Sequence, residues 1–199
     1  MAISAADVKT LRDMTGAGMM DCKKALMEVE GDIEKAIQYL REKGAAIAEK
    51  KGGRATNDGV IETYVHAGSK LGVMVEINCE TDFVAKTEEF KQLARDIAMQ
   101  IAAANPVSVS REEIPEDLIA KEREIYTHQA KNEGKPDKII DRYVDGKLNK
   151  FYQETALMEQ GFVKDPKKSI RDIITEVIAK LGENITVRRF VRYQLGEEL

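Results

Sequence analysis

Apolar residues recur at every third or fourth position through residues 4–43, which is the period of amphipathic helices. Ser4 and Asp7 have the spacing of a capping box at the start of the first helix. The glycines of the Thr15–Gly18 turn end this helix, because glycine permits a sharp reversal of the backbone. The pattern therefore predicts a first helix followed by a tight turn.

Two more helices follow at the same period. The second begins near Met19, which is predicted on its apolar face, and ends at Gly31. Asp32 is placed to cap the third helix, and Gly44 is a suitable C-terminal stop. Three helices of this length bury little surface, so residues 1–44 are predicted to form a small helical domain that docks on something else.

The apolar period changes after a segment without periodicity. Residues 45–58 are rich in Gly, Lys and Ala and are interpreted as a frayed helix followed by a linker. Alternating apolar and polar positions in residues 60–66 and 71–79 then predict a β-hairpin, and residues 185–196 predict a third strand. We therefore expect an α+β core in residues 59–199, with a three-stranded antiparallel sheet packed by helices.

Helical periodicity fills the interval between these strands. One helix is predicted over residues 87–103, and a pair over 116–133 and 137–160 is broken by Gly134-Lys135-Pro136. This pair reads as an antiparallel helical hairpin of about residues 116–160. Ser169 with Asp172 is expected to cap a last helix that ends at Gly182.

Composition indicates a globular protein with a well-solvated surface. Of 199 residues, 43% are apolar and 33% are charged, and the net charge is −4. A chain without excess positive charge is not expected to bind nucleic acid directly. No apolar run approaches the roughly 20 residues that cross a bilayer, so a cytoplasmic protein without membrane contact is expected. Cys22 and Cys79 are far apart, which fits buried thiols, although a disulfide stays possible by counting alone.

Residues that could carry catalysis are sparse. Gly16-Ala17-Gly18 lacks the third glycine and the preceding strand of a phosphate-binding loop. His66 and His128 have no cysteine or carboxylate at metal-ligand spacing. The adjacent acidic pairs, such as Glu88-Glu89, point in different directions and do not form an acid–base pair. We therefore expect no enzyme, no cofactor and no metal site.

Arginines in the last predicted strand leave an RNA-binding alternative open. Arg188, Arg189 and Arg192 alternate with apolar and aromatic residues. A solvated or subunit-facing edge is the preferred interpretation, because the surrounding chain is acidic.

Two stretches are distinctive beyond their periodicity: TGAGMMDCKKAL at Thr15–Leu26 and VMVEINCETDFVAKTEEF at Val73–Phe90. Together they resemble the elongation factor Ts family, and the resemblance continues through FVKDPKKSI and LGENITVRRFVRYQLG to cover essentially the whole chain. It implies a guanine-nucleotide exchange factor that promotes release of GDP from elongation factor Tu. It also implies a ubiquitin-associated-like fold for the N-terminal helices.

The resemblance assigns a role to Thr81-Asp82-Phe83-Val84. In the family, this turn enters the GTPase domain of elongation factor Tu near the magnesium and phosphate site, and the phenylalanine inserts between helices of the partner. Spacing alone favours another interpretation, in which Phe83 fastens the following helix to its own core. The two interpretations predict opposite exposure of the Phe83 ring.

The resemblance also places Arg12, Met19 and Met20 against a helix of elongation factor Tu. Methionine is common in cores, but two successive helical residues cannot both face one core, so at least one is expected to be exposed. Lys23 and Lys24 are weaker candidates, since lysines are usually solvated.

Long family members carry two related core subdomains, whereas this chain has room for one. It resembles the short form, which is a homodimer whose sheets pack against each other, and a three-stranded sheet needs such cover. A ubiquitin-associated-type adaptor that uses residues 4–43 is the main alternative of another class.

Overall fold

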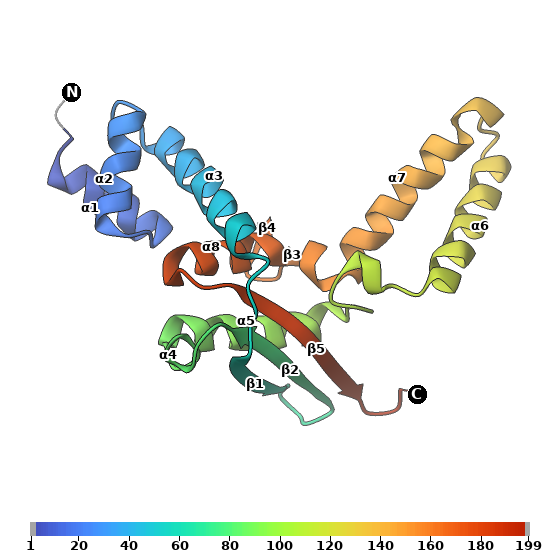
Figure 1. The fold of residues 1–199 in the computed structure, drawn as a ribbon. Helices are drawn as coiled ribbons and strands as arrows, with labels where there is room; N and C mark the ends of the chain where they lie inside the picture. Colours follow the sequence, from blue (N-terminus) through green and yellow to red (C-terminus); the bar gives the residue numbers. More distant parts are fainter. Residues whose placement is uncertain (1–2, 198–199) are drawn as a thin grey trace. The chain divides into compact units, whose positions relative to one another are not determined.

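The computed structural model describes residues 3–197 and has an α+β fold (Figure 1). Within that range the chain contains eight α-helices and a three-stranded antiparallel sheet of order β1-β2-β5, and β3 and β4 form a separate two-stranded ribbon. The chain divides into two compact units. The first unit contains residues 3–60, 78–93 and 173–186, and the second contains residues 61–77, 94–172 and 187–197.

The first unit begins with three helices: α1 (Ala5–Thr15), α2 (Met19–Glu28) and α3 (Ile33–Lys51). The predicted caps of α1 and α3 are confirmed, since Ser4 and Asp7 form a complete capping box and the Asp32 side chain accepts from Lys35 N. The helices enclose a small apolar core of Val8, Leu11, Cys22, Ala25, Leu26 and Ala36.

The predicted end of the third helix at Gly44 is wrong. Helix α3 continues to Lys51, so residues 45–51, which were interpreted as a frayed helix before a linker, are regular helix. Gly44 is buried within α3, and a Cβ built there would lie 3.4 Å from Ala179 Cβ of α8 (Ile170–Leu181). Helices α3 and α8 therefore pack closely at Gly44, and this glycine does not end α3.

The rest of the first unit includes the short helix α4 (Asp82–Ala85), the start of α5 (Glu88–Ala104) and most of α8. Ser169 and Asp172 form the predicted capping box of α8, with Asp172 N donating to Ser169 Oγ at 3.1 Å. The predicted end at Gly182 is also confirmed, because this residue has a φ of +74°.

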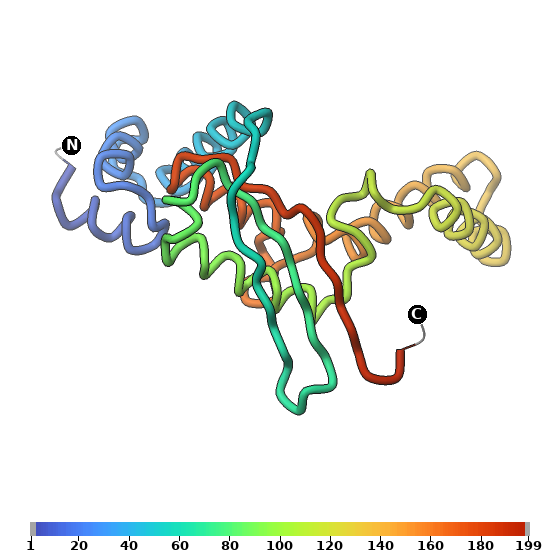
Figure 2. Tube along the Cα trace, turned by 60° about the horizontal axis from the view of Figure 1, so that its bottom comes forward, coloured from blue at the N-terminus to red at the C-terminus, as the bar shows by residue number. Residues whose placement is uncertain are grey.

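The second unit holds most of the sheet, whose strands are β1 (Asp58–Val65), β2 (Leu71–Cys79) and β5 (Ile185–Gln194). Val73, Val75 and Ile77 of β2 are buried, as the alternating pattern predicts. Leu195 N donates to Lys70 O at 2.8 Å, so the end of β5 lies beside the loop of the β1–β2 hairpin (Figure 2).

A helical hairpin of α6 (Glu116–Asn132) and α7 (Asp137–Thr155) extends within the second unit (Figure 1). Ala130, Ile140, Val144 and Leu148 form its own small core. Two short 3-10 helices, η1 (Arg111–Glu113) and η2 (Leu157–Glu159), lie near its base.

The sequence pattern missed a ribbon that follows the hairpin. Strands β3 (Gly161–Phe162) and β4 (Asp165–Ser169) pair antiparallel in a region where Asp165-Pro166 had been interpreted only as a break. Gln100 and Gln160 are buried near this ribbon, and Gln100 Nε2 donates to Gln160 Oε1 at 3.1 Å and to Gly161 O of β3 at 3.2 Å. No helix in the described part of the chain combines the length and apolarity that crossing a membrane requires.

Candidate functional site

The Thr81-Asp82-Phe83-Val84 turn forms the junction between β2 and α4. Thr81 is the N-cap of α4, has extended backbone angles, and its Oγ accepts from Val84 N at 3.5 Å. Helix α4 contains only four residues, which is too short to be stable without contacts outside itself. The sequence pattern did not predict this separate helix, which places Phe83 on a single helical turn.

Neighbouring side chains of the turn have opposite environments. Phe83 is 79% exposed, whereas Val84 is 9% and Ala85 is 6% exposed. Val84 and Ala85 are therefore part of the hydrophobic core and anchor α4, whereas the ring of Phe83 is presented to solvent. The ring is outside the protein's own core, which removes the interpretation in which Phe83 fastens α4 internally.

Asp82 contributes a negative charge at the first position of α4, where the helix dipole favours it. Its carboxylate forms an ion pair with Lys86 one turn later. The Lys86 ammonium lowers the pKa of Asp82 below its ordinary value, so the carboxylate is charged at neutral pH. The turn thus presents an aromatic ring and an adjacent carboxylate.

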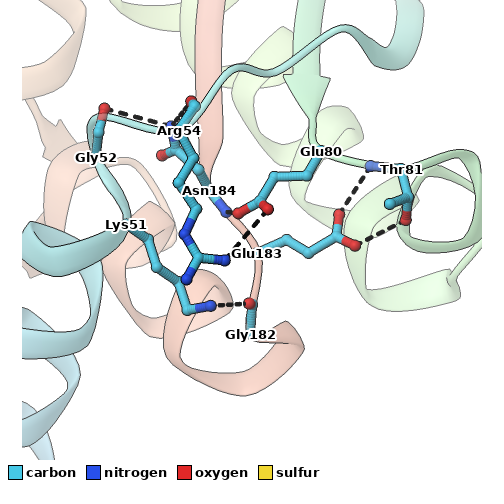
Figure 3. A network of polar contacts seen from close by, with 8 residues as sticks. All are labelled: Lys51, Gly52, Arg54, Glu80, Thr81, Gly182, Glu183 and Asn184. Atoms are coloured by element: carbon cyan, nitrogen blue, oxygen red, sulfur yellow. Dashed lines mark hydrogen bonds and ion pairs between the residues drawn. The ribbon is translucent and has the colours of Figure 1, made fainter.

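Glu183, in the turn between α8 and β5, holds Thr81 in place through two hydrogen bonds (Figure 3). Thr81 N donates to Glu183 Oε2 at 3.0 Å, and Thr81 Oγ donates to Glu183 Oε1 at 2.7 Å. The preceding residue, Glu80, accepts from Asn184 N at 2.7 Å, which lowers the pKa of Glu80. The sequence analysis did not identify these residues, although Glu183 and Asn184 lie in the LGEN stretch that contributes to the family resemblance.

Cys79 ends β2 just before the turn and is a buried, free thiol. Its Sγ donates to Thr81 O at 3.2 Å. Burial raises the pKa of Cys79 to about 11, so the thiol is protonated at neutral pH. Cys22 is also free and buried, and burial raises its pKa as well. Neither cysteine forms a disulfide in the structure.

The other residues singled out by the resemblance lie on α1 and α2. Arg12 is exposed, Met19 is 46% exposed and Met20 is 63% exposed. The prediction of Met19 on the apolar face is wrong, because the buried face of α2 consists of Cys22, Ala25 and Leu26.

Two further methionines, which the sequence analysis did not propose as partner contacts, are exposed in the same three-helix region: Met14 on α1 and Met27 on α2. Met20 and Met27 are seven residues apart, so they lie on one face of α2. Lys23 and Lys24 are exposed as well. This N-terminal surface (Arg12, Met14, Met19, Met20 and Met27) combines flexible apolar side chains with positive charge.

The arginines of β5 form ion pairs with carboxylates of the same chain. Arg188 and Arg189 both approach Glu76, with Arg189 Nε at 2.8 Å from Glu76 Oε2. Arg192 pairs with Glu197 at 2.8 Å. These pairs offset the positive charge of the strand, so the structure does not favour the RNA-binding alternative.

The two histidines are surface residues with local partners. Tyr64 Oη lies 2.9 Å from His66 Nδ1, and His128 Nε2 lies 3.8 Å from Glu124 Oε1. Across residues 3–197, no group of three or more His, Cys, Asp and Glu side chains is arranged to hold a metal ion.

An exposed aromatic ring on an anchored turn, together with exposed methionines on neighbouring helices, is typical of a protein that docks on another protein. Comparison with known proteins specifies the class. A family model described as "Elongation factor TS" matches residues 2–197. The chain belongs to the elongation factor Ts family.

Close relatives agree along nearly their whole length. The chain is 59% identical to elongation factor Ts of Thermoanaerobacter sp. (strain X514), over 98% of this chain and 96% of the relative. It is 61% identical to elongation factor Ts of Desulforamulus reducens, over 99% of this chain and 91% of the relative. The family resemblance inferred from the sequence motifs is confirmed, and it supports a nucleotide-exchange role in translation elongation.

Proposed function

We propose that this chain is a guanine-nucleotide exchange factor that binds elongation factor Tu and promotes release of GDP during translation elongation. Family membership supports this role, and the exposure of Phe83 on an anchored turn is the observation that carries its mode of action. The role is not enzymatic, since the factor makes and breaks no covalent bond. It operates in the cytoplasm, without a cofactor or metal of its own and without contact to nucleic acid or membrane.

In this proposal the Thr81–Val84 turn enters the GTPase near its magnesium and phosphate site. Phe83 inserts between helices of elongation factor Tu, where an apolar ring gains by leaving water. Asp82 brings its carboxylate towards the phosphates, and like charges at short range repel. Thr81 and Val84 hold the turn, because one caps α4 and the other is buried beneath it.

The energy available from Phe83 sets a limit on what it does alone. Burial of one phenylalanine contributes about 1.5–3 kcal/mol. A shift of about 10⁴ in a population ratio requires roughly 5.5 kcal/mol of differential affinity. The Phe83 contact therefore needs a second contact that holds the GTPase in its nucleotide-free form.

The N-terminal surface supplies that second contact in our proposal, with Arg12, Met19 and Met20 against a helix of elongation factor Tu. Methionine suits such a surface because its flexible side chain adapts to a partner. We propose that residues 1–44 act as a docking module of ubiquitin-associated-like fold. Residues 45–58, which begin as the end of α3, set its distance from the core of residues 59–199.

Exchange then follows from linkage between two ligands of one GTPase. The factor binds the nucleotide-free form more tightly than the GDP-bound form, so GDP weakens the binding of the factor by the same ratio. Binding at both surfaces moves elongation factor Tu towards the open form, and excess GTP then occupies the vacated site.

The first prediction is that Phe83→Ala reduces stimulated release of labelled GDP from elongation factor Tu by about tenfold or more, the equivalent of the lost burial energy. The complex with nucleotide-free elongation factor Tu should still be detectable, because the N-terminal contact is intact. Ile125→Ala, which truncates another exposed apolar side chain on α6, is the matched control. Unchanged GDP release by Phe83→Ala would remove this turn from the mechanism.

A homodimer through the core sheet is the second part of the proposal. Exposed apolar side chains occur on all three strands: Ile61 and Val65 of β1, Met74 of β2, and Val191 and Tyr193 of β5. Apolar patches of this kind on a small sheet mark an interface, and we assign a second copy of this chain as the cover.

A further inference from the structure

Three separate segments meet beside the Phe83 turn (Figure 3). They are the end of α3 with the residues after it (51–54), the β2–α4 junction (80–81) and the α8–β5 turn (182–184). All three belong to the first compact unit. We call this meeting point the junction network.

Glu183 engages both hydrogen-bond donors of Thr81. Its two carboxylate oxygens accept from Thr81 N and Thr81 Oγ at 3.0 and 2.7 Å. Hydrogen bonds to an ionised acceptor are roughly twice as strong as neutral ones. Because the Thr81 hydroxyl proton points to Glu183, the lone pairs of Oγ are left to accept from Val84 N. Glu183 thus fixes the cap that starts α4.

Asn184 connects this turn to the end of α3. Its backbone N donates to Glu80 at 2.7 Å, and its side-chain Nδ2 donates to Arg54 O at 2.8 Å and to Gly52 O at 3.4 Å. Asn184 is only 3% exposed, so these bonds are shielded from water. Two more contacts close the network: Arg54 with Glu80 at 3.4 Å, and Lys51 Nζ with Gly182 O.

This geometry constrains both proposed docking surfaces. Helix α3 packs on α1 and α2 through the core that Ala36 shares with Leu11 and Leu26. Hydrogen bonds to the end of α3 therefore also restrain the helices that carry the N-terminal surface. The same few residues also fix the cap beneath Phe83. A binder whose contacts are already held in the bound arrangement loses less conformational entropy on binding.

We propose that Glu183 and Asn184 are positioning residues for nucleotide exchange, which hold the Phe83 turn and the end of α3 in one rigid arrangement. Glu183 acts on Phe83 through Thr81, and Asn184 joins the turn to residues 52–54. This inference rests on the proposed exchange function, and it adds that residues 52–54 are fixed by side chains and do not act as a flexible tether.

The second prediction concerns Glu183→Ala in the full-length chain. Stimulated GDP release should fall by about tenfold, since a charge-assisted contact to the cap is lost. Amide hydrogen exchange of residues 82–86 should become faster, because α4 loses its fixed N-cap. Glu183→Gln keeps one carbonyl acceptor and one amide donor for Thr81, so it should recover most of the rate. Glu49→Ala, which removes an exposed glutamate from α3, is the matched control and should change neither measurement.

A double-mutant cycle with Phe83→Ala separates positioning from a general loss of stability. If Glu183 acts through the turn, Glu183→Ala should cause no further loss of GDP release once Phe83 is alanine. Additive losses, or unchanged hydrogen exchange of residues 82–86 in Glu183→Ala, would overturn the positioning role. If Glu183→Ala fails to fold, Glu183→Asp decides instead, because its shorter side chain withdraws the carboxylate from Thr81 while the Thr81 side chain that caps α4 is kept, and it should reproduce the loss.

Failure of the proposed function gives a different result. In that case Phe83→Ala alone leaves GDP release unchanged, whatever happens at Glu183. A positioning role that is wrong shows the reverse: Phe83→Ala slows release of GDP, while Glu183→Ala and Glu183→Asp leave both GDP release and hydrogen exchange as in the unsubstituted chain.

Discussion

Phe83 and Val84 are consecutive residues of α4, yet one is presented to solvent and the other is buried. Successive positions on a helix are rotated by about 100°, so a single turn can anchor with one side chain and expose the next. Exposing a phenylalanine on a mobile loop would allow the ring to fold back onto apolar surface. Anchoring by Val84 and Ala85 keeps the ring outward.

The two cysteines illustrate how burial controls reactivity at the residue scale. Burial raises the pKa of Cys79 to about 11 and also raises the pKa of Cys22. The thiolate is the reactive form, and it is scarce at neutral pH in both cases.

The third prediction is that neither cysteine reacts with iodoacetamide in the native protein at pH 7.5, whereas both react after denaturation. Mass spectrometry of the alkylated protein measures the number of modified thiols. Because burial raises both thiol pKa values, the rate of alkylation of the folded protein should stay low even when the pH rises above about 8.5, the ordinary pKa of a cysteine thiol. Rapid labelling of Cys79 at pH 7.5 would show that the end of β2 opens readily.

Local sequence rules succeeded where the deciding partners are close along the chain. The capping boxes of Ser4 with Asp7 and of Ser169 with Asp172 join residues three positions apart, and both are present. The turn at Gly16 depends on a left-handed backbone, and its φ of +65° agrees. Such features are readable because the sequence window contains both partners.

At the element scale, Gly44 shows where a local rule fails. A glycine after a helical run usually marks a C-terminal cap, but α3 passes through Gly44 to Lys51. The reason is the helix packed against it: a Cβ at Gly44 would lie 3.4 Å from Ala179 Cβ, about 135 positions later in the chain. Ribbon β3–β4 was missed for a related reason, because strands of two and five residues have too few positions to show a period.

The fourth prediction is that Gly44→Ala raises the free energy of unfolding by about 0.5–1 kcal/mol, whereas Gly44→Leu lowers it. The added methyl group reaches ordinary contact distance from Ala179, and alanine is the better helix former. A leucine has no room between α3 and α8. Urea unfolding monitored by circular dichroism measures both changes.

Gly146→Ala is the control for helix propensity alone, because a Cβ there meets nothing within 4 Å. It should stabilise α7 by a similar amount. Tolerance of leucine at Gly44 without loss of stability would contradict close packing of α3 on α8.

At the scale of the whole molecule, the Phe83 turn depends on residues that no local pattern connects. Thr81 and Glu183 are 102 positions apart, and Asn184 and Glu80 are 104 apart. The sequence predicted the sheet and the long helices, and it singled out the Phe83 turn as a candidate site. It did not predict the separate α4 or the support beneath it, since these depend on which segments the fold brings together.

The proposed homodimer also belongs to the scale of the whole molecule, and substitutions on the exposed face of the sheet can test it. Ile61, Val65 and Met74 are exposed apolar side chains on two neighbouring strands, and a stable interface buries about 800 Å² on each partner. A carboxylate buried without a partner in such an interface costs several kcal/mol.

The fifth prediction is therefore that Met74→Glu converts a homodimer into a monomer, as measured by sedimentation equilibrium at micromolar concentration. Ile139→Glu, which places the same charge on the exposed side of α7, should leave the dimer intact. If the unsubstituted chain sediments as a monomer at micromolar concentrations, a second copy of this chain does not cover the sheet, and the proposed homodimer is excluded.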